Sequence, residues 1–344
     1  MAAGAGRCTF RDLRSRGLIA AALAVVLAAP AAATAAVHGV DVSHWQGRIA
    51  WPRVGRAGYR FAFLKATDGR RKNDWTYVVF RNGATAAHLR IGAYHMARPD
   101  GKTVAAARTD AAAEADHFVA TARVGVGDLP PVLDLEHTGG LRSRMLIVWT
   151  AAWLDEVQRQ LGIRAAIYTS VWFWRVAMAD TSTFAARGHP LWIARWTRAA
   201  WPSVPASNWG NAGWTFWQWT DCGRVPGIHG CVDRDRFNGY ALTDVLVPPA
   251  PVLVSPPSVG GIARVGETLT AAAGTWQADP LPTLAYSWRR CDASGGACEA
   301  IPEATEETYV VSAADAGHTL SVEVTATSRG RSAVADSPPT ARVE

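Results

Sequence analysis

The chain has 344 residues and a formal net charge of +6 at pH 7, a length that allows about two domains with a sizeable core. The basic residues are dispersed rather than run together, which argues against nucleic acid as a partner. After the first 36 residues no apolar stretch reaches about 18 residues, the length of a membrane span, which argues against a membrane-spanning protein.

Residues 1–36 have the three parts of a secretory signal peptide. Four arginines precede an apolar stretch at residues 18–29, and Ala33-Thr34-Ala35 matches a cleavage site. The apolar stretch is too short to span a membrane, although an uncleaved anchor is the alternative. We therefore expect a secreted protein, extracellular or associated with the cell wall, with no stable membrane insertion after cleavage.

The charge is unevenly distributed along the chain. Residues 37–247 carry 25 basic and 17 acidic side chains, a net charge of +8, whereas residues 248–344 carry 6 basic and 11 acidic ones, a net charge of −5. A basic exported domain suits an anionic partner such as a cell wall, through long-range attraction. A generally soluble basic surface explains the same charge equally well.

Short apolar runs alternate with amphipathic stretches throughout residues 37–247. Helical periodicity is best at residues 75–89, 104–121 and 143–161. Alternating strands and helices predict an α/β fold with a parallel sheet, and eight strands in about 210 residues predict a modified β/α barrel. The predicted strands are residues 37–43, 61–67, 91–96, 131–136, 165–170, 190–196, 214–220 and 231–237.

The last predicted strand breaks the pattern. Only ten residues separate Thr220 from Cys231, and they include Pro226 and Gly227, whereas a parallel crossover needs about a dozen or more. We therefore predict an irregular, antiparallel last strand, which would place Asp233 at the rim where the other strands end.

The cysteines form two pairs of near neighbours. Cys222 with Cys231 and Cys291 with Cys298 are expected to form disulfides in an oxidising compartment. Metal binding is the alternative use of clustered cysteines, but no CxxC spacing occurs.

The sequence changes character at residues 248–260, a proline-rich stretch that we predict to be a linker. Of the 16 tryptophans, 14 precede it. Residues 261–344 alternate apolar and polar positions in short runs separated by turn residues, which predicts a small all-β sandwich domain.

Two carboxylates, Asp134 and Glu136, end the apolar run at residues 131–136. Alternate residues of a strand share a face, and catalytic groups of such barrels lie at strand ends. The alternative is solvent exposure at a frayed strand end. Glycoside hydrolysis needs one protonated and one ionised carboxyl group, and close like charges of Asp41, Asp134 and Asp233 would raise the pKa of Glu136.

Other polar and aromatic side chains allow further roles. Tyr94, Tyr168 and Trp192 lie near the predicted rim, where their rings suit sugar stacking, although large aromatics are also common in cores. His44 and His95 with the aspartates would suit a metal-dependent deacetylase, but no HxxxH or HxH spacing occurs. His137 is a loop residue in one interpretation and a base in the other.

Eight ordered segments resemble the glycoside hydrolase family 25 lysozymes, over nearly all of residues 37–247 and none of the tail. The segments are GVDVSHWQGRIAW (39–51), FAFLKATDG (61–69), IGAYHMARP (91–99), PVLDLE (131–136), AAIYTS (165–170), LWIARW (191–196), FWQWT (216–220) and GCVDRDRF (230–237). The resemblance implies cleavage, without a cofactor, of the β-1,4 bond between N-acetylmuramic acid and N-acetylglucosamine in peptidoglycan.

The resemblance also implies roles for individual residues. Glu136 falls on the family's catalytic acid, and Asp41, Asp134 and Asp233 fall on its assisting aspartates. Whether the reaction retains, inverts or uses the substrate's acetamido group stays open, and in the last case Asp134 would position that group. The residues expected to bind substrate are Tyr94, Tyr168, Trp192, Gln218, Asp68 and His95.

Three positions depart from the usual family pattern: Asp68 stands where Glu is usual, Asp235 where Asn is common, and Met96 where an aromatic is frequent. Asp235 is expected to add a negative charge near the site. The tail resembles bacterial immunoglobulin-like modules and would serve either as a spacer or in weak adhesion.

The resulting hypothesis is a secreted, monomeric muramidase whose partner is the glycan strand of peptidoglycan. Two alternatives remain: a catalytically silent wall-binding protein, and the metal-dependent polysaccharide deacetylase.

Overall fold

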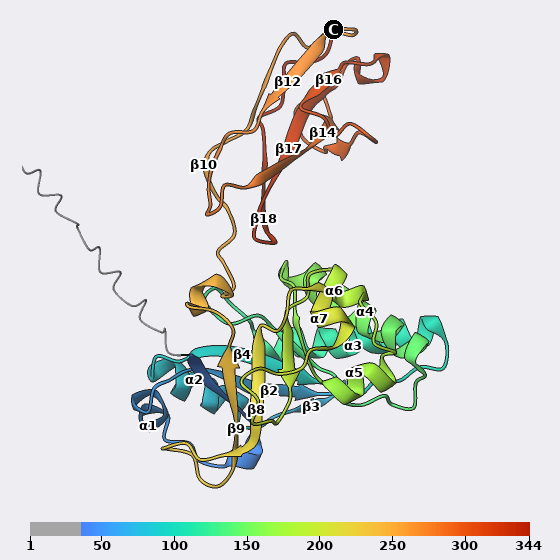
Figure 1. Ribbon diagram of the computed structural model, residues 1–344. Helices are drawn as coiled ribbons and strands as arrows, with labels where there is room; N and C mark the ends of the chain where they lie inside the picture. The colour runs from blue at the N-terminus through green and yellow to red at the C-terminus, as the bar shows by residue number, and fades with distance from the viewer. Residues whose placement is uncertain (1–35) are drawn as a thin grey trace, which may run out of the picture. The chain divides into compact units, whose positions relative to one another are not determined.

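The computed structural model describes residues 36–344, so the predicted signal peptide lies outside the described residues. The described chain contains a strand-and-helix unit up to about residue 247 and an all-β unit after it, each with its own sheets (Figure 1). No helix of residues 36–344 is long and apolar enough to cross a membrane.

Eight strands of the first unit close into a barrel. They are β1 (Val37–Val42), β2 (Tyr59–Asp68), β4 (Arg90–Met96), β5 (Val132–Asp134), β6 (Ala166–Ser170), β7 (Leu191–Ala194), β8 (Phe216–Gly223) and β9 (Val232–Phe237), and the two-residue β3 (Lys72–Asn73) extends β2. The order around the barrel is β1-β9-β8-β7-β6-β5-β4-β2, and β2 pairs with β1 to complete the ring. All eight predicted strands are confirmed.

Apart from the short β3, which pairs antiparallel with β2, the strands from β1 to β8 pair in parallel, whereas β9 runs antiparallel to both of its neighbours, β8 and β1. The predicted antiparallel last strand is therefore confirmed. The predicted disulfide between Cys222 and Cys231 is present and joins the end of β8 to the residue before β9.

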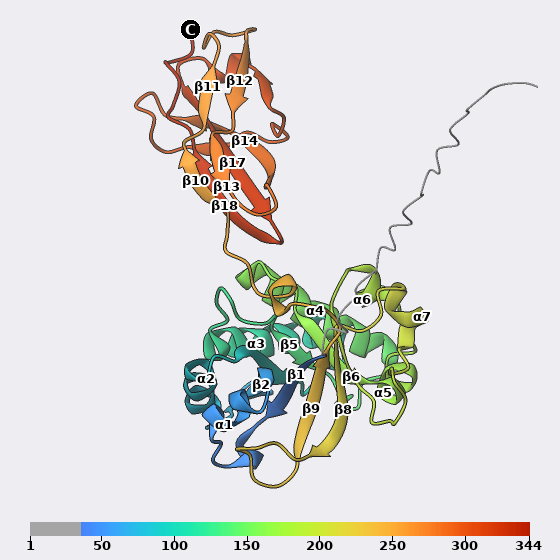
Figure 2. The ribbon, with the colours of Figure 1, turned by 60° about the vertical axis from the view of Figure 1, so that its left-hand side comes forward.

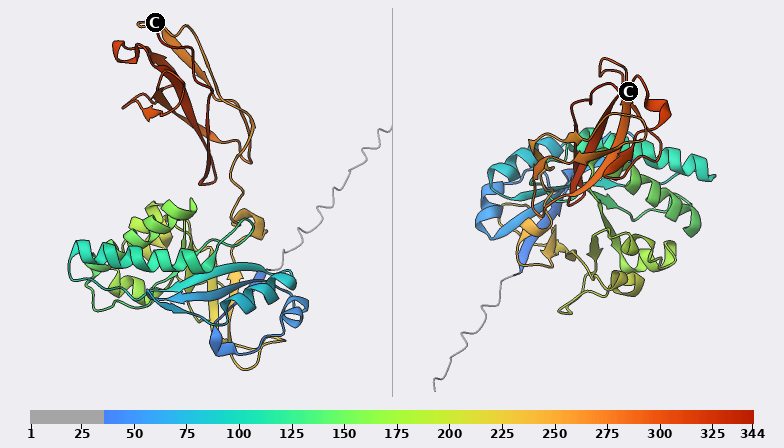
Figure 3. Two further views of the ribbon diagram at one scale, coloured as in Figure 1. Left: turned by 180° about the vertical axis from the view of Figure 1, so that it is seen from behind. Right: turned by 90° about the horizontal axis from the view of Figure 1, so that it is seen from above.

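Helices cover much of the outside of the barrel. They are α1 (Trp51–Arg56), α2 (Tyr77–Ala86), α3 (Val104–Ala122), α4 (Ser143–Leu161), α5 (Val171–Ala177), α6 (Thr183–Ala186) and α7 (Pro205–Gly210), with the 3-10 turns η1 (His44–Gln46) and η2 (Leu242–Asp244). The three longest were predicted, whereas α1, α5, α6 and α7 are too short to show a period. Seen from behind, α3 and α4 lie along the outer side of the sheet (Figure 3).

Local sequence sets where the long helices begin and end. The Thr103 hydroxyl accepts a hydrogen bond from the Ala106 N–H at 3.2 Å and so caps α3. Gly162 ends α4 with a φ of 65°, a left-handed conformation that glycine adopts at little cost.

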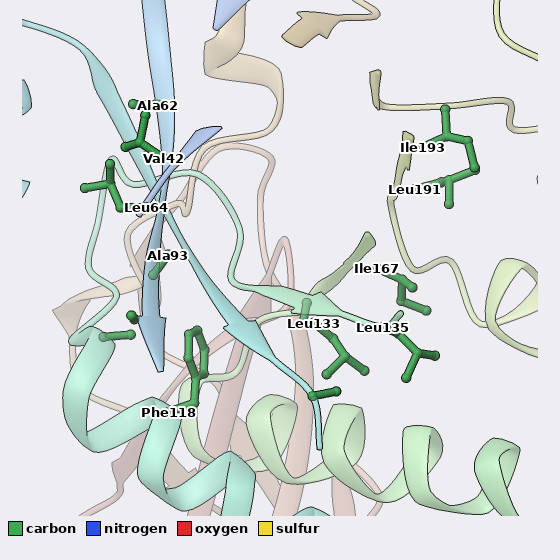
Figure 4. Packing of buried hydrophobic residues seen from close by; sticks show 14 of the residues in the cluster. Val42, Ala62, Leu64, Ala93, Phe118, Leu133, Leu135, Ile167, Leu191 and Ile193 are labelled. Carbon is green, nitrogen blue, oxygen red and sulfur yellow. The ribbon is translucent and has the colours of Figure 1, made fainter. Parts of the chain in front are cut away.

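The barrel has an outer and an inner apolar layer. The outer layer lies between strands and helices, and Figure 4 shows Phe118 of α3 pointing toward the strands that carry Leu64 and Ala93. The inner layer fills the barrel and contains Phe63 stacked on Trp192, with ring centroids 4.3 Å apart. Because these rings fill the interior, the polar site lies at the mouth.

Two glycines of the barrel wall make room for those rings. A Cβ atom on Gly39 would lie 2.2 Å from the Phe61 ring, and one on Gly92 would lie 2.3 Å from the Phe63 ring. Real Cβ atoms do not approach so closely, so the phenylalanine rings would have to move.

The second unit is built of strands alone apart from the 3-10 turn η3 (Ala313–Asp315). Its strands are β10 (Val252–Ser255), β11 (Ser258–Gly260), β12 (Thr268–Ala272), β13 (Thr275–Gln277), β14 (Thr283–Cys291), β15 (Glu299–Ala300), β16 (Thr308–Val310), β17 (Thr319–Ser328) and β18 (Arg331–Asp336). They form sheets β10-β13, β11-β12-β16 and β15-β14-β17-β18 around a core that includes Trp288 and Val322. The all-β prediction and the disulfide between Cys291 and Cys298 are confirmed.

The predicted linker at residues 248–260 is wrong from Val252 onward. Strand β10 pairs with β13, and β11 pairs with β12, so both belong to the all-β unit. Pro256 and Pro257 lie in the turn between the two strands, where a missing N–H costs no sheet hydrogen bond. The proline-rich composition therefore did not predict where the all-β unit begins.

We predict that Gly39→Ala lowers the free energy of unfolding of the barrel by about 1–3 kcal/mol, because the added methyl group overpacks the Phe61 ring. Urea unfolding followed by tryptophan fluorescence measures this. Gly125→Ala is the matched control, since its Cβ would meet only Asp128 Oδ2 at 3.9 Å. Equal stability of the two variants would contradict the packing argument.

Candidate active site

A polar pocket lies at the end of the barrel where the parallel strands terminate. Its lining residues are Asp41, Val42, Ser43, Trp45, Gln46, Lys65, Tyr94, Met96, Asp134, Glu136, Tyr168, Trp192, Gln218 and Asp233. All four carboxyl groups predicted to form the rim therefore share one pocket. Asp233 reaches it because β9 is antiparallel, which places it directly opposite Asp41 in the β1–β9 pair.

Asp134 and Glu136 share this pocket but differ in exposure. Asp134 ends β5 and is only 4% exposed, whereas Glu136 lies two residues later and is exposed. Leu135 between them is fully buried in the outer apolar layer, as the alternation of a strand requires. The pair therefore combines one carboxyl group at the pocket opening with one behind it.

The environment of Asp134 favours a bound proton. Burial, followed by the neighbouring Glu136 carboxylate, raises the pKa of Asp134 well above its ordinary value. Within residues 36–344, Asp134 Oδ1 has no hydrogen-bond partner although it is buried. The predicted rise in the pKa of Glu136 stays a prediction.

A second set of acids surrounds Asp41. Burial raises the pKa of Asp41 well above its ordinary value, and burial together with Asp41 raises the pKa of Asp233 to about 9. Asp235 is fully buried beside them and accepts a hydrogen bond from Trp192 Nε1 at 2.9 Å. Burial raises the pKa of Asp235 as well and so favours its neutral form. These surroundings oppose the negative charge that was expected at Asp235.

Gln218 connects three sides of the pocket. Its Nε2 donates to Asp41 Oδ2 at 2.9 Å, while its Oε1 accepts from the Tyr168 hydroxyl at 3.0 Å and from Trp196 Nε1 at 3.1 Å. Gln218 was predicted to bind substrate, and it does line the pocket. Its amide is also fully engaged in holding Asp41 and Tyr168 in place.

The predicted aromatic residues do not contribute equally. Tyr94, Tyr168 and Trp192 line the pocket but are only 8%, 6% and 2% exposed, so they present edges rather than open faces. Trp45 on η1, in contrast, lines the same pocket and is 81% exposed. An open indole face at the rim is the better platform for a sugar ring.

Sequence reasoning missed Lys65, which lines the pocket and donates to Asp68 Oδ2 at 2.7 Å. Strand alternation contained the signal, because Lys65 follows Phe61 and Phe63 at every second position of β2. Its ammonium lowers the pKa of Asp134 and so partly opposes the effects of burial and Glu136. Lys65 thus places a cation at the pocket wall.

Two residues predicted to bind substrate lie elsewhere. His95 is fully buried on the helix side of β4, with its ring stacked on Trp153 and its Nε2 2.7 Å from Glu114 Oε2. It alternates with Tyr94, which faces the barrel interior, so the prediction for His95 is wrong. Asp68 does not line the pocket either, since it is held in ion pairs with Lys65 and Arg98.

The ligand set of the deacetylase alternative is not assembled. His95 faces the helices, and His44 pairs with Asp74 at 2.7 Å rather than with the pocket acids. In residues 36–344 no group of three His, Cys, Asp or Glu side chains is placed to hold a metal ion. His137, the candidate base, is exposed beside Glu136.

We predict that Asp233→Asn changes the free energy of unfolding of the barrel, relative to the wild type, by about 1 kcal/mol or more in the stabilising direction between pH 4 and pH 8. A carboxyl with a raised pKa is protonated in the folded state and ionised in the unfolded state between pH about 4 and 9, so the stability of the wild type falls as pH rises through that window. Asparagine removes this dependence.

Urea unfolding at both pH values tests this prediction, with Asp244→Asn, an exposed carboxyl on η2, as the matched control. A difference between Asp233→Asn and the wild type that is the same at both pH values would contradict the assignment of the proton to Asp233.

Known proteins share this barrel. The model of the family described as "Glycosyl hydrolases family 25" matches residues 40–228. The chain is 36% identical to "Lysozyme M1" of Streptomyces globisporus over 60% of this chain and 70% of that protein. It is 33% identical to an "N,O-diacetylmuramidase" of Arthroderma benhamiae over 64% of this chain and 92% of that protein.

A solved lysozyme structure is similar to this chain as well. The bacterial lysozyme of Streptomyces coelicolor is 35% identical, covers 61% of this chain and 95% of its own, and superimposes with a TM-score of 0.55. The family model spans more than half of the chain, and the pocket acids Asp41, Asp134 and Glu136 lie within its matched residues. The chain therefore belongs to the glycosyl hydrolases of family 25.

Proposed function

We propose that this family 25 hydrolase is a lysozyme that cleaves the β-1,4 bond between N-acetylmuramic acid and N-acetylglucosamine in peptidoglycan. The observation that carries the proposal is the pairing of an exposed Glu136 with a buried Asp134 in one pocket of a family 25 barrel. The relatives named as a lysozyme and an N,O-diacetylmuramidase support the choice of substrate.

In this proposal Glu136 is the general acid. Its exposed carboxyl group is placed to reach the oxygen of the leaving sugar, and the buried Asp134 lies behind it in the same pocket. Protonation of the leaving oxygen lets the glycosidic bond break as positive charge develops at the sugar carbon. The pair then shares the negative charge that Glu136 acquires.

Asp134 has a second role in this proposal. Its buried Oδ1 has no partner in the described part of the chain and belongs to a pocket-lining residue, so it is available to bind the acetamido group at the reacting sugar. A carboxyl held there orients that group for attack on the sugar carbon, which is the substrate-assisted alternative. Gln218 fixes Asp41 opposite, where Asp41 and Asp233 form the other wall.

We further propose that the protein acts outside the cell, at the wall, as a monomer. The predicted signal peptide, the two disulfides and the net charge of +8 in residues 37–247 support an exported protein that meets an anionic wall. The all-β unit, which resembles an immunoglobulin-like module in sequence, would serve as a spacer or in weak adhesion.

We predict that Glu136→Gln lowers the rate of clearing of bacterial cell walls by about 10²–10⁴-fold, because the amide cannot donate the proton. Turbidity assays measure the rate, and circular dichroism checks the fold. His137→Gln is the matched control, since it changes the exposed neighbouring residue. Wild-type clearing by Glu136→Gln would exclude Glu136 as the acid, and loss of clearing in His137→Gln would assign the base role to His137.

Digested peptidoglycan is expected to gain reducing ends that are muramic acid rather than glucosamine, as mass spectrometry of the reduced fragments can determine. Activity is expected to survive a chelator, because no step of the proposed reaction uses a metal. Wall binding without new reducing ends would favour the silent wall-binding alternative, and release of acetate that stops on chelation would favour the deacetylase.

A further inference from the structure

The outer wall of the barrel at β8, β9 and β1 differs from the rest of its outside. In β/α barrels a helix follows each strand and covers it, but a hairpin rather than a crossover helix joins β8 to β9, and β9 then pairs with β1, the first strand of the chain. In Figure 2 the arrows of β8 and β9 are seen with no helix in front of them. The side chains of this wall must therefore provide their own cover.

Two arginines form that cover. Arg234 and Arg236 alternate on β9 with Asp233 and Asp235, so they point outward while the aspartates point into the barrel. The Arg234 guanidinium lies over Trp219 at 4.4 Å from its ring centroid, and that of Arg236 lies over the same ring at 4.7 Å. Each also lies near a second ring, Tyr59 at 5.9 Å or Trp217 at 5.2 Å.

These cations have no counter-charge in the described part of the chain. Neither arginine takes part in any ion pair found within residues 36–344. The Nε atoms of both and the Nε1 of Trp219 are buried yet lack hydrogen-bond partners there. Three N–H donors of neighbouring side chains thus lack an acceptor within residues 36–344, although buried donors are normally satisfied.

The electrostatics agree with this geometry. Burial, followed by the charge of Arg234, lowers the pKa of Arg236. Burial, followed by Arg236 and Arg234, also lowers the pKa of His38 on the adjacent β1. In both cases the charge of a neighbouring arginine adds to the effect of burial, and a bound anion would oppose that added effect.

We propose that Arg234, Arg236 and Trp219 form an anion-binding site on the outer wall of the barrel, separate from the catalytic pocket, that holds a phosphate group of a polyol-phosphate polymer in the cell wall. Guanidinium groups bind phosphate with paired N–H donors, and the two free oxygens of a phosphodiester can accept from both arginines. The net charge of +8 in residues 37–247 attracts such a polymer from a distance.

The arrangement of the side chains favours a polyol-phosphate polymer over nucleic acid as the ligand. Trp219 has two guanidinium groups within 4.7 Å of its ring centroid, which leaves less of the ring for stacking a nucleic-acid base. The site would retain the enzyme at its insoluble substrate without occupying the catalytic pocket.

The test is binding of a fluorescent poly(glycerol phosphate) oligomer to the full chain, followed by anisotropy. Arg234→Gln/Arg236→Gln is expected to weaken binding about tenfold or more, since each charged hydrogen bond contributes on the order of a tenfold change. Arg108→Gln/Arg144→Gln removes the same charge from exposed helix positions and is the matched control. Equal weakening by the two double variants would overturn the proposal, because it would show general charge attraction.

Three further measurements separate recognition of the phosphate from folding, from general charge attraction and from catalysis. Arg234→Lys/Arg236→Lys retains both charges and the aliphatic stems over Trp219 but loses the planar donors, so weaker binding with an unchanged circular dichroism spectrum separates recognition from folding. Polyglutamate and single-stranded DNA of equal charge should bind more weakly, and tighter binding of either would overturn the assignment to a polyol phosphate. Hydrolysis of a short soluble glycan should change less than about twofold in the Arg234 and Arg236 double variants. Loss of that hydrolysis in Glu136→Gln tests the proposed catalytic function, so the two proposals can fail separately.

Discussion

The antiparallel pairing of β9 with both β8 and β1 is the constraint on which the rest of this barrel depends. If the last strand were parallel to its neighbours, it would need a crossover longer than the ten residues between Thr220 and Cys231. The hairpin closes the ring instead, and the disulfide between Cys222 and Cys231 joins its two arms. Because β9 begins where its neighbours end, it delivers Asp233 to the face that already holds Asp41.

Placing these acids at the top of a filled barrel determines their chemistry. Aromatic rings such as Phe63 and Trp192 occupy the interior below, so carboxyl groups beside them lose water. Ionised carboxylates are costly in such surroundings, and the free energy is lowered by binding protons instead. Burial therefore raises the pKa of Asp41, Asp134 and Asp233 and favours their neutral forms. Glu136, at the open edge, is the member of the set that a glycan can reach.

Sequence was sufficient where a pattern repeats or where a spacing excludes alternatives. The strands of the barrel, the three long helices, the hairpin and the four-carboxylate pocket could all be predicted from alternation, helical period and loop length. The short helices could not, because one or two turns show no period. His95 was placed wrongly because a motif gives neighbours in sequence, whereas alternation sends His95 and Tyr94 to opposite sides of β4.

The linker was misplaced for a related reason. Proline is excluded from the centre of a sheet but not from the turns beside it, so the proline-rich stretch was compatible with strands that begin between its prolines. Pairing partners more than ten residues away, such as Trp276 opposite Leu253, decide whether Val252 begins a strand. Pairing between residues so far apart in the sequence cannot be predicted from the composition of the stretch itself.

The sequence VDRDRF of β9 combines the two chemistries of the barrel in one strand. Asp233 and Asp235 face inward, and Arg234 and Arg236 face outward, so a slip of one residue would bury the guanidinium groups and expose the acids. Inside the barrel, the hydrogen bond from Trp192 Nε1 to Asp235 opposes that slip. The pleat of β9 therefore separates the acids of the pocket from the arginines of the outer wall, so a ligand held by the arginines lies on the opposite face of the strand from the catalytic acids.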